Sequence, residues 1–181
     1  MRSTRTSLAG LAGLLAAGSM VLSATSAVAA EETSNTLRIT YTCTEPPWPG
    51  SASSSYDVTV TAPLTARRGQ QFALTASLRS VSPAPGDVPA NALQGYANLL
   101  VGGSGSGTTT AKGLTNATDV KKGDIVLLSG GKALYTPTKL GVHTFTPDKF
   151  QLTTHQDTTI VCVPDKSGVI VAVPVSEPIK G

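Results

Sequence analysis

The residues of this sequence that could catalyse a reaction are few, and their spacing matches no catalytic arrangement. The only histidines are His143 and His155, and a hydrolase would need one of them to activate a nucleophile. His143 stands near Phe145 in an expected strand, so we expect it on the surface or partly packed. His155 stands beside Asp157 in an expected turn, where polar residues are common. We therefore predict no catalytic residue and no enzymatic activity.

Glycine-rich and acidic segments do not change this prediction. Residues 102–107 read Gly-Gly-Ser-Gly-Ser-Gly, which lacks both the Gly-x-Ser-x-Gly spacing of a nucleophile elbow and the lysine of a phosphate-binding loop. We expect a flexible loop between two strands. The acidic residues that could form a glycosidase pair are scattered, with no spacing that singles out two of them. They are Glu45, Asp57, Asp119, Asp124 and Asp148.

The two cysteines, Cys43 and Cys162, are expected to form a disulfide if the protein folds in an oxidising compartment. The alternative is a pair of buried thiols. Neither cysteine has a second cysteine or a histidine at the spacing of a zinc site, and no calcium-loop motif occurs. We therefore predict no metal site and no cofactor.

Trp48 is the one residue that suggests a binding function. It is the only tryptophan, and it lies between Pro47 and Pro49 in a stiff loop over residues 45–50. A rigid exposed aromatic ring can anchor a partner or stack on a sugar. Sugar-binding sandwiches generally use several aligned aromatics, however, and this chain is only 4% aromatic. The ring could equally fold back and cap the core, so both roles remain open.

Alternation of apolar and polar residues predicts the elements that position these residues. It indicates strands at 36–43, 56–62, 72–79, 125–128, 133–136, 142–146, 150–154, 158–163 and 169–173. Turn signals at 130–132 and 146–149 separate strands in the second half. Segment 91–101 fits either a strand or a short helix.

About eight to ten short strands, with turns every 8–12 residues or so, predict an all-β, immunoglobulin-like antiparallel β-sandwich. Cys43 lies on an early strand and Cys162 on a late one. Their disulfide would therefore join the two sheets through the core.

The first residues are typical of a secretory signal peptide. Arg2 and Arg5 precede an apolar run of small residues and leucine, which is shorter than the ~20 residues that span a bilayer. We expect cleavage after Ala29 or Ala30. The predicted organisation is thus a signal peptide at 1–29 and one domain at 30–181, secreted and without a transmembrane anchor.

The charge of the chain excludes one class of partner. The formal net charge is +3, but two arginines belong to the expected signal, so the remaining chain is nearly neutral. Its longest basic runs are the pairs at 67–68 and 121–122. Nucleic-acid binding needs a clustered positive face, so we do not expect it.

Several of these motifs resemble an uncharacterised family of small secreted actinobacterial proteins with immunoglobulin-like sandwiches. They are Thr40-Tyr41-Thr42-Cys43 with a Pro/Gly-rich turn after it, Lys-Lys-Gly-Asp at 121–124, the Pro-x-x-x-Gly turn at 137–141 before Val142-His143-Thr144-Phe145, and the late Cys162. The resemblance implies the fold and supplies no catalytic residues. The chain departs from antibody-type domains, because Trp48 lies in a proline loop and not on a core strand.

The function predicted from sequence is a secreted, non-catalytic structural or binding module of the extracellular space or cell envelope. Its partner would be an unknown extracellular protein or polysaccharide. One alternative is a carbohydrate-binding module that depends on Trp48. Another is a secreted hydrolase or a protease inhibitor, with residues 83–89 as the inhibitory loop.

Overall fold

Side chains that alternate between buried and exposed positions build the strands of this protein. The computed structural model describes residues 31–46 and 50–178, which contain strands and no helix. The strands are β1 (Glu32–Thr44), β2 (Ser51–Pro63), β3 (Ala66–Arg67), β4 (Phe72–Pro83), β5 (Leu93–Gly103), β6 (Gly107–Thr115), β7 (Ile125–Tyr135), β8 (Gly141–Thr154), β9 (Thr159–Pro164) and β10 (Val171–Ser176). The predicted all-β class is confirmed, and segment 91–101 contributes to a strand.

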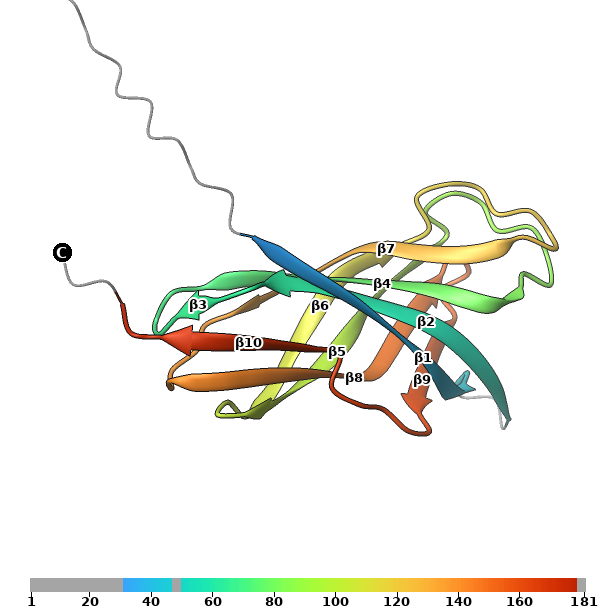
Figure 1. The fold of residues 1–181 in the computed structure, drawn as a ribbon. Helices are drawn as coiled ribbons and strands as arrows, with labels where there is room; N and C mark the ends of the chain where they lie inside the picture. The colour runs from blue at the N-terminus through green and yellow to red at the C-terminus, as the bar shows by residue number, and fades with distance from the viewer. Residues whose placement is uncertain (1–30, 47–49, 179–181) are drawn as a thin grey trace, which may run out of the picture.

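Eight of these strands close into an antiparallel barrel (Figure 1). Their order is β8-β5-β6-β7-β4-β2-β1-β9, and β9 pairs back onto β8. The other two strands lie outside this ring: β10 pairs with β8, and the short β3 pairs with β10. The predicted immunoglobulin-like sandwich is therefore wrong, because one sheet closes on itself and there are not two sheets facing each other.

Two expected turns are not turns, and this explains the error. Segments 130–132 and 146–149 lie inside the continuous strands β7 and β8. Gly130 has a positive φ of 83°, and Pro147 pairs with Leu99 at a shift in the β5–β8 register. Such irregularities bend a strand without ending it. Long, bent strands can wrap around a common axis, which is what barrel closure requires.

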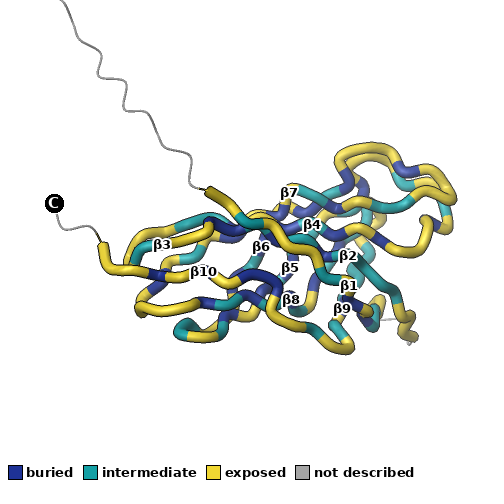
Figure 2. The backbone as a smooth tube through the Cα atoms, viewed as in Figure 1, coloured by how far each residue is buried: buried dark blue, intermediate teal, exposed yellow. Residues whose placement is uncertain are grey.

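Aromatic and aliphatic side chains of the wall strands form the buried core, and Figure 2 marks in dark blue the backbone stretches that carry buried residues. Tyr41 packs edge-on against Tyr56 and Phe150, with ring centroids 5.9 and 4.8 Å away. A second edge-on group contains Phe72, Tyr135 and Phe145. Burial raises the pKa of the Tyr41 and Tyr56 hydroxyls, because an ionised phenol is poorly solvated there.

Candidate functional site

His143 is fully buried, so the expectation of a surface or partly packed position is wrong. Its Nε2 lies 2.9 Å from the Lys139 carbonyl oxygen, and its Nδ1 lies 2.8 Å from the Tyr135 hydroxyl. Because a carbonyl can only accept, Nε2 holds the proton and Nδ1 accepts from Tyr135. Both ring nitrogens are thus used in holding the β7–β8 turn. The shared face of His143 and Phe145 in the period-two pattern was the signal for this burial.

Gly105 packs directly over this pair. A Cβ built on it would collide with His143 Nδ1 and would lie 2.7 Å from the Tyr135 hydroxyl. The glycine-rich segment 102–107 therefore covers the end of the barrel next to the imidazole. Its glycines serve this close approach, and the ring is closed off from a substrate.

Two of the five candidate acidic residues, Asp57 and Asp119, bind a cation and the main chain respectively. The Asp57 carboxylate receives two hydrogen bonds from the Arg38 guanidinium, at 2.8 and 3.0 Å. These bonds lower the pKa of Asp57 and raise that of Arg38. Asp119 accepts from the Ala90 amide at 2.7 Å. Within residues 31–46 and 50–178, no three His, Cys, Asp or Glu side chains come together as a possible metal site.

His155 and Asp157 lie exposed in the turn between β8 and β9, as the sequence predicted. Asp157 has a positive φ of 58°, a conformation that aspartate tolerates in turns. Its amide donates to the Thr154 carbonyl at 3.0 Å. The turn conformation and its hydrogen bond explain the presence of these polar residues without a catalytic role.

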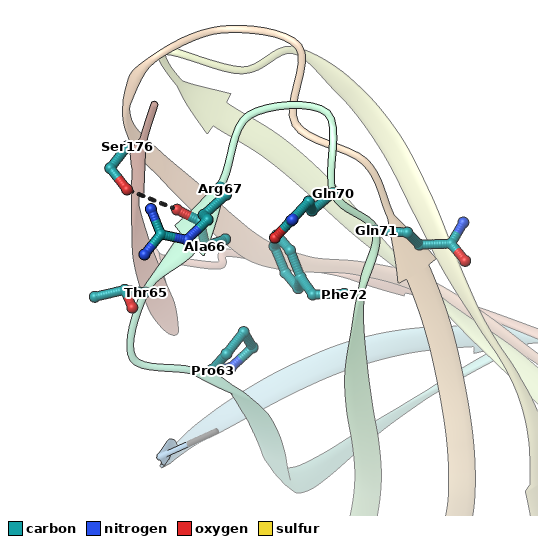
Figure 3. Close-up of a pocket in the computed structure, with 8 residues that line it drawn as sticks. All are labelled: Pro63, Thr65, Ala66, Arg67, Gln70, Gln71, Phe72 and Ser176. Carbon is teal, nitrogen blue, oxygen red and sulfur yellow. Dashed lines mark hydrogen bonds between the residues drawn. The ribbon is translucent and has the colours of Figure 1, made fainter. Parts of the chain in front are cut away.

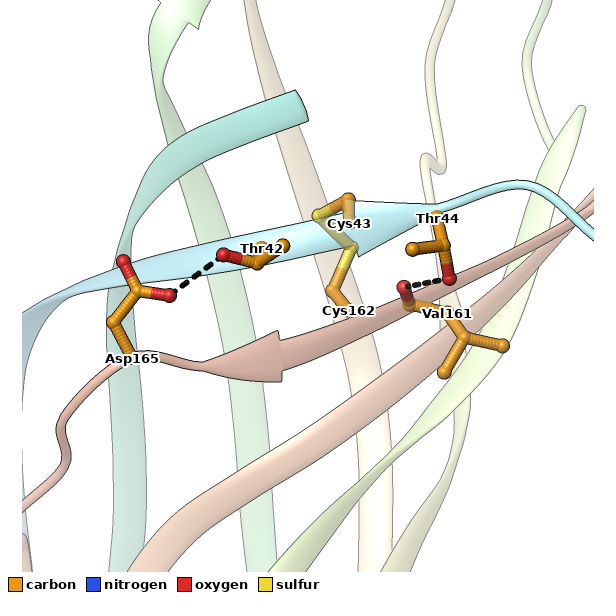
Figure 4. Close-up of a disulfide and its surroundings, with 6 residues drawn as sticks. All are labelled: Thr42, Cys43, Thr44, Val161, Cys162 and Asp165. Atoms are coloured by element: carbon orange, nitrogen blue, oxygen red, sulfur yellow. Dashed lines mark hydrogen bonds between the residues drawn. A yellow bond between two sulfur atoms is a disulfide. The ribbon is translucent and has the colours of Figure 1, made fainter. Parts of the chain in front are cut away.

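Cys43 and Cys162 form the predicted disulfide, with an S–S distance of 2.04 Å (Figure 4). They face each other directly in the register of β1 and β9, with Cα atoms 4.0 Å apart. The expectation that the bond joins two sheets is wrong. It links two neighbouring strands at the point where β9 closes the barrel.

Just beyond this disulfide, the strand that closes the barrel is interrupted. β9 and β10 run in the same direction along β8. From Cys162 to Val171 the chain advances nine residues, whereas their partners on β8, Phe150 and Phe145, are only five apart. Four residues are therefore looped out between β9 and β10. When the chain returns as β10 it still pairs with β8 but no longer with β1.

The interruption leaves a groove beside β1. Its volume is about 650 Å³, and it is lined by residues 37–40 on β1 and residues 165–168 of the looped-out segment. At one end the Asp165 amide donates to the Thr40 carbonyl at 2.9 Å. At the other end the Asn35 side-chain amide donates to the Ile170 carbonyl at 3.0 Å. The groove is thus bounded at both ends by hydrogen bonds.

The backbone of β1 within the groove has no partner strand. In an antiparallel strand, alternate residues direct their amide and carbonyl groups to the same edge. Because the Thr40 carbonyl points to the β9 side, Arg38 and Thr36 also direct their backbone groups to that side. In the part of the chain that the structure describes, neither β-pairing nor any other hydrogen bond reaches these groups.

Some polar side chains of the groove have hydrogen-bond or ion-pair partners among the described residues, and others do not. Asp165 accepts a hydrogen bond from Thr42 Oγ1 at 2.7 Å (Figure 4), and Arg38 is bound to Asp57. Lys166 is exposed and takes part in no ion pair among the described residues. Ser167 Oγ is buried, and it has no hydrogen-bond partner in the same described ranges. A buried hydroxyl of this kind indicates a missing partner.

A second, smaller pocket of about 220 Å³ lies near β3 (Figure 3). Its lining combines the half-buried ring of Phe72 with Thr65, Arg67 and Gln70, whereas Figure 3 shows the side chain of the neighbouring Gln71 directed away from them. The Phe72 ring also packs edge-on in the core. The pocket therefore offers polar groups around one side of a ring that already serves the core.

Three residues predicted to matter, Trp48, Ala29 and Ala30, lie outside the described residues. No helix in the described ranges is long and apolar enough to cross a membrane. No protein-family model, no curated protein and no solved structure matches this chain.

Proposed function

We propose that this protein is a secreted, non-catalytic binding module of the extracellular space or cell envelope. The observation that carries this proposal is the groove beside β1, where the strand edge of the barrel wall faces a looped-out segment that carries the buried Ser167 hydroxyl and Lys166, a lysine without an ion pair among the described residues. Binding residues are most effective when a rigid scaffold positions them, because less entropy is lost on association. The resemblance to secreted actinobacterial proteins stays a prediction.

The arrangement of chemically active side chains supports a binding role over catalysis. Both nitrogens of the buried His143 are occupied by Tyr135 and Lys139. Asp57 is neutralised by Arg38. A nucleophile with an adjacent base and an orienting group, which a hydrolase would need, is not assembled around either of these residues.

A carbohydrate-binding module is the second candidate, and the pocket of Figure 3 is the observation in its favour. An aromatic ring flanked by amide, hydroxyl and guanidinium groups is suited to a sugar. The protease-inhibitor alternative has less support. Its expected loop is fixed to the neighbouring chain by a hydrogen bond from the Ala84 amide to the Asp124 carbonyl and by the β-bridge between Val88 and Val120.

Affinity retention tests the proposal. The purified, disulfide-bonded protein is immobilised and exposed to envelope polysaccharides and, separately, to defined extracellular proteins from the same culture. Saturable retention of one of them is expected to weaken by about five-fold when the groove is altered by Lys166→Glu, and to be unchanged in Gln70→Ala, which alters the second pocket. The opposite pattern would favour the carbohydrate alternative, and Trp48→Ala tests the remaining sequence candidate in the same assay.

A further inference from the structure

The groove beside β1 has the shape of a missing strand segment. β9 fills the place between β8 and β1 at one end of the barrel, and β10 leaves the corresponding place beside β1 empty. We propose, resting on the binding function above, that the groove binds an extended polypeptide segment that adds to the edge of β1 and bears an acidic side chain.

The exposed edge of β1 selects a polypeptide as the occupant. Arg38 directs an amide donor and a carbonyl acceptor into the groove, and Thr36 directs the same groups to the same open edge of β1, at the two-residue repeat of a β-strand. Only another extended backbone offers donors and acceptors at this same repeat, and strand addition is a common mode of peptide recognition. Between its two boundaries, Asn35 and Thr40, the open edge accommodates about four residues at roughly 3.3 Å each.

The charge and burial of the lining residues indicate which side chains the bound segment should carry. Lys166 is exposed beside the groove without an ion-pair partner among the described residues, whereas Arg38 is paired with Asp57 and the Asp165 carboxylate is held by a hydrogen bond from the Thr42 hydroxyl. A carboxylate on the incoming segment would pair with Lys166. Leu37 is partly buried at the edge of the core, so an apolar side chain would extend the core at that point. The buried Ser167 Oγ would gain a hydrogen-bond partner.

A second copy of the chain fits this groove less well. β1 of another molecule lies within a barrel wall, paired to β2 along its length, and cannot enter a slot that is bounded at both ends. Two grooves brought face to face would also place one Lys166 near the other. A short segment without a fold of its own avoids both problems.

Hydrogen exchange of the purified, disulfide-bonded protein gives the first test. The amides of Thr36 and Arg38 should exchange rapidly, whereas those of Leu37 and Ile39, which face β2, should be protected. Equal protection at all four would overturn the proposal. In that case light scattering tells whether a second copy covers the edge, through a dimer, or the protein's own chain covers it in a monomer.

Titration with a defined peptide gives the second test. A short peptide that alternates valine with glutamate should shift the Thr36 and Arg38 amide signals and slow their exchange. The matched peptide with lysine in place of glutamate should bind more weakly by about five-fold, as should the glutamate peptide on Lys166→Glu. Absence of shifts at these amides, or shifts concentrated elsewhere, would contradict the assignment of the groove, and equal affinity for both peptides would contradict its acidic specificity.

Thr36→Pro removes one groove-facing amide, and Thr36→Val is its matched control because it keeps the amide and loses the same hydroxyl. Proline is tolerated where the amide faces outward from an edge, so Leu37 and Ile39 protection should persist. Peptide affinity should fall about ten-fold in the proline variant only. If the proline variant does not fold, Lys166→Glu still decides. A partner retained equally by wild type and Lys166→Glu, with no shift of the Thr36 and Arg38 amide signals, would overturn the groove but leave the binding function intact.

Discussion

The amide of Asp165 donates to the carbonyl of Thr40 at 2.9 Å, and this is the last hydrogen bond between the β9 side of the barrel and β1 before the two separate. Up to that bond, the wall is closed and fixed by the neighbouring Cys43–Cys162 disulfide. Past it, four residues loop out and the edge of β1 is open. The covalent link therefore stands next to the opening, which keeps that end of the groove rigid.

Loss of the disulfide should weaken the barrel without changing its strand order. We expect the double change Cys43→Ala and Cys162→Ala to lower the free energy of unfolding by ~2–5 kcal/mol, because the bond closes a loop that spans most of the described chain. Urea denaturation of the oxidised wild type and the double variant measures the difference. Reduced wild type is the control, and equal midpoints for all three would contradict the expectation.

Gly105 should not tolerate a side chain. Gly105→Ala places a methyl group against His143 Nδ1 and the Tyr135 hydroxyl, and the resulting overpacking should cost ~1–3 kcal/mol. Gly86→Ala is the matched control, because no atom lies within 4 Å of its added Cβ. Thermal unfolding of both variants checks this, and an unchanged midpoint for Gly105→Ala would mean that the glycine-rich segment does not pack on the imidazole.

Removing the buried Ser167 hydroxyl should not destabilise the protein. Ser167 Oγ has no partner among the described residues, so Ser167→Ala should leave the free energy of unfolding unchanged or raise it slightly. Ser80→Ala should cost ~1–3 kcal/mol instead, because Ser80 Oγ donates to the Ser82 carbonyl and accepts from the Val126 amide. Comparable losses in the two variants would show that Ser167 has a partner in the free protein.

Alkaline pH should destabilise the barrel through its buried phenols. Burial raises the pKa of Tyr41 and Tyr56 above their ordinary value of 10.0. Above that pH the unfolded chain loses phenolic protons that the folded chain retains, so stability falls as pH rises. Urea midpoints measured from about pH 8 to 11 should decline, and less steeply in Tyr41→Phe. The same slope in wild type and Tyr41→Phe would exclude Tyr41 as a source.

The sequence alone predicted the all-β class, most strand positions and the pairing of Cys43 with Cys162. These depend on local alternation and on the presence of only two cysteines, so they require no knowledge of distant contacts. The burial of His143 was visible in its shared face with Phe145, but the partners Tyr135 and Lys139 were not.

Tertiary structure alone decided that the sheet closes into a barrel and where it stays open. Segments that contain a glycine or a proline, such as those at Gly130 and Pro147, look the same in sequence whether they form a turn between two strands or an irregularity within one strand. Only pairing with distant strands distinguishes these two cases. The groove arises in the same way. The chain between β9 and β10 is four residues longer than the matching stretch of β8, and these four residues loop out and separate β10 from β1. Such a difference between the lengths of paired segments has no signature in either segment, because it is a relation between strands distant in the chain.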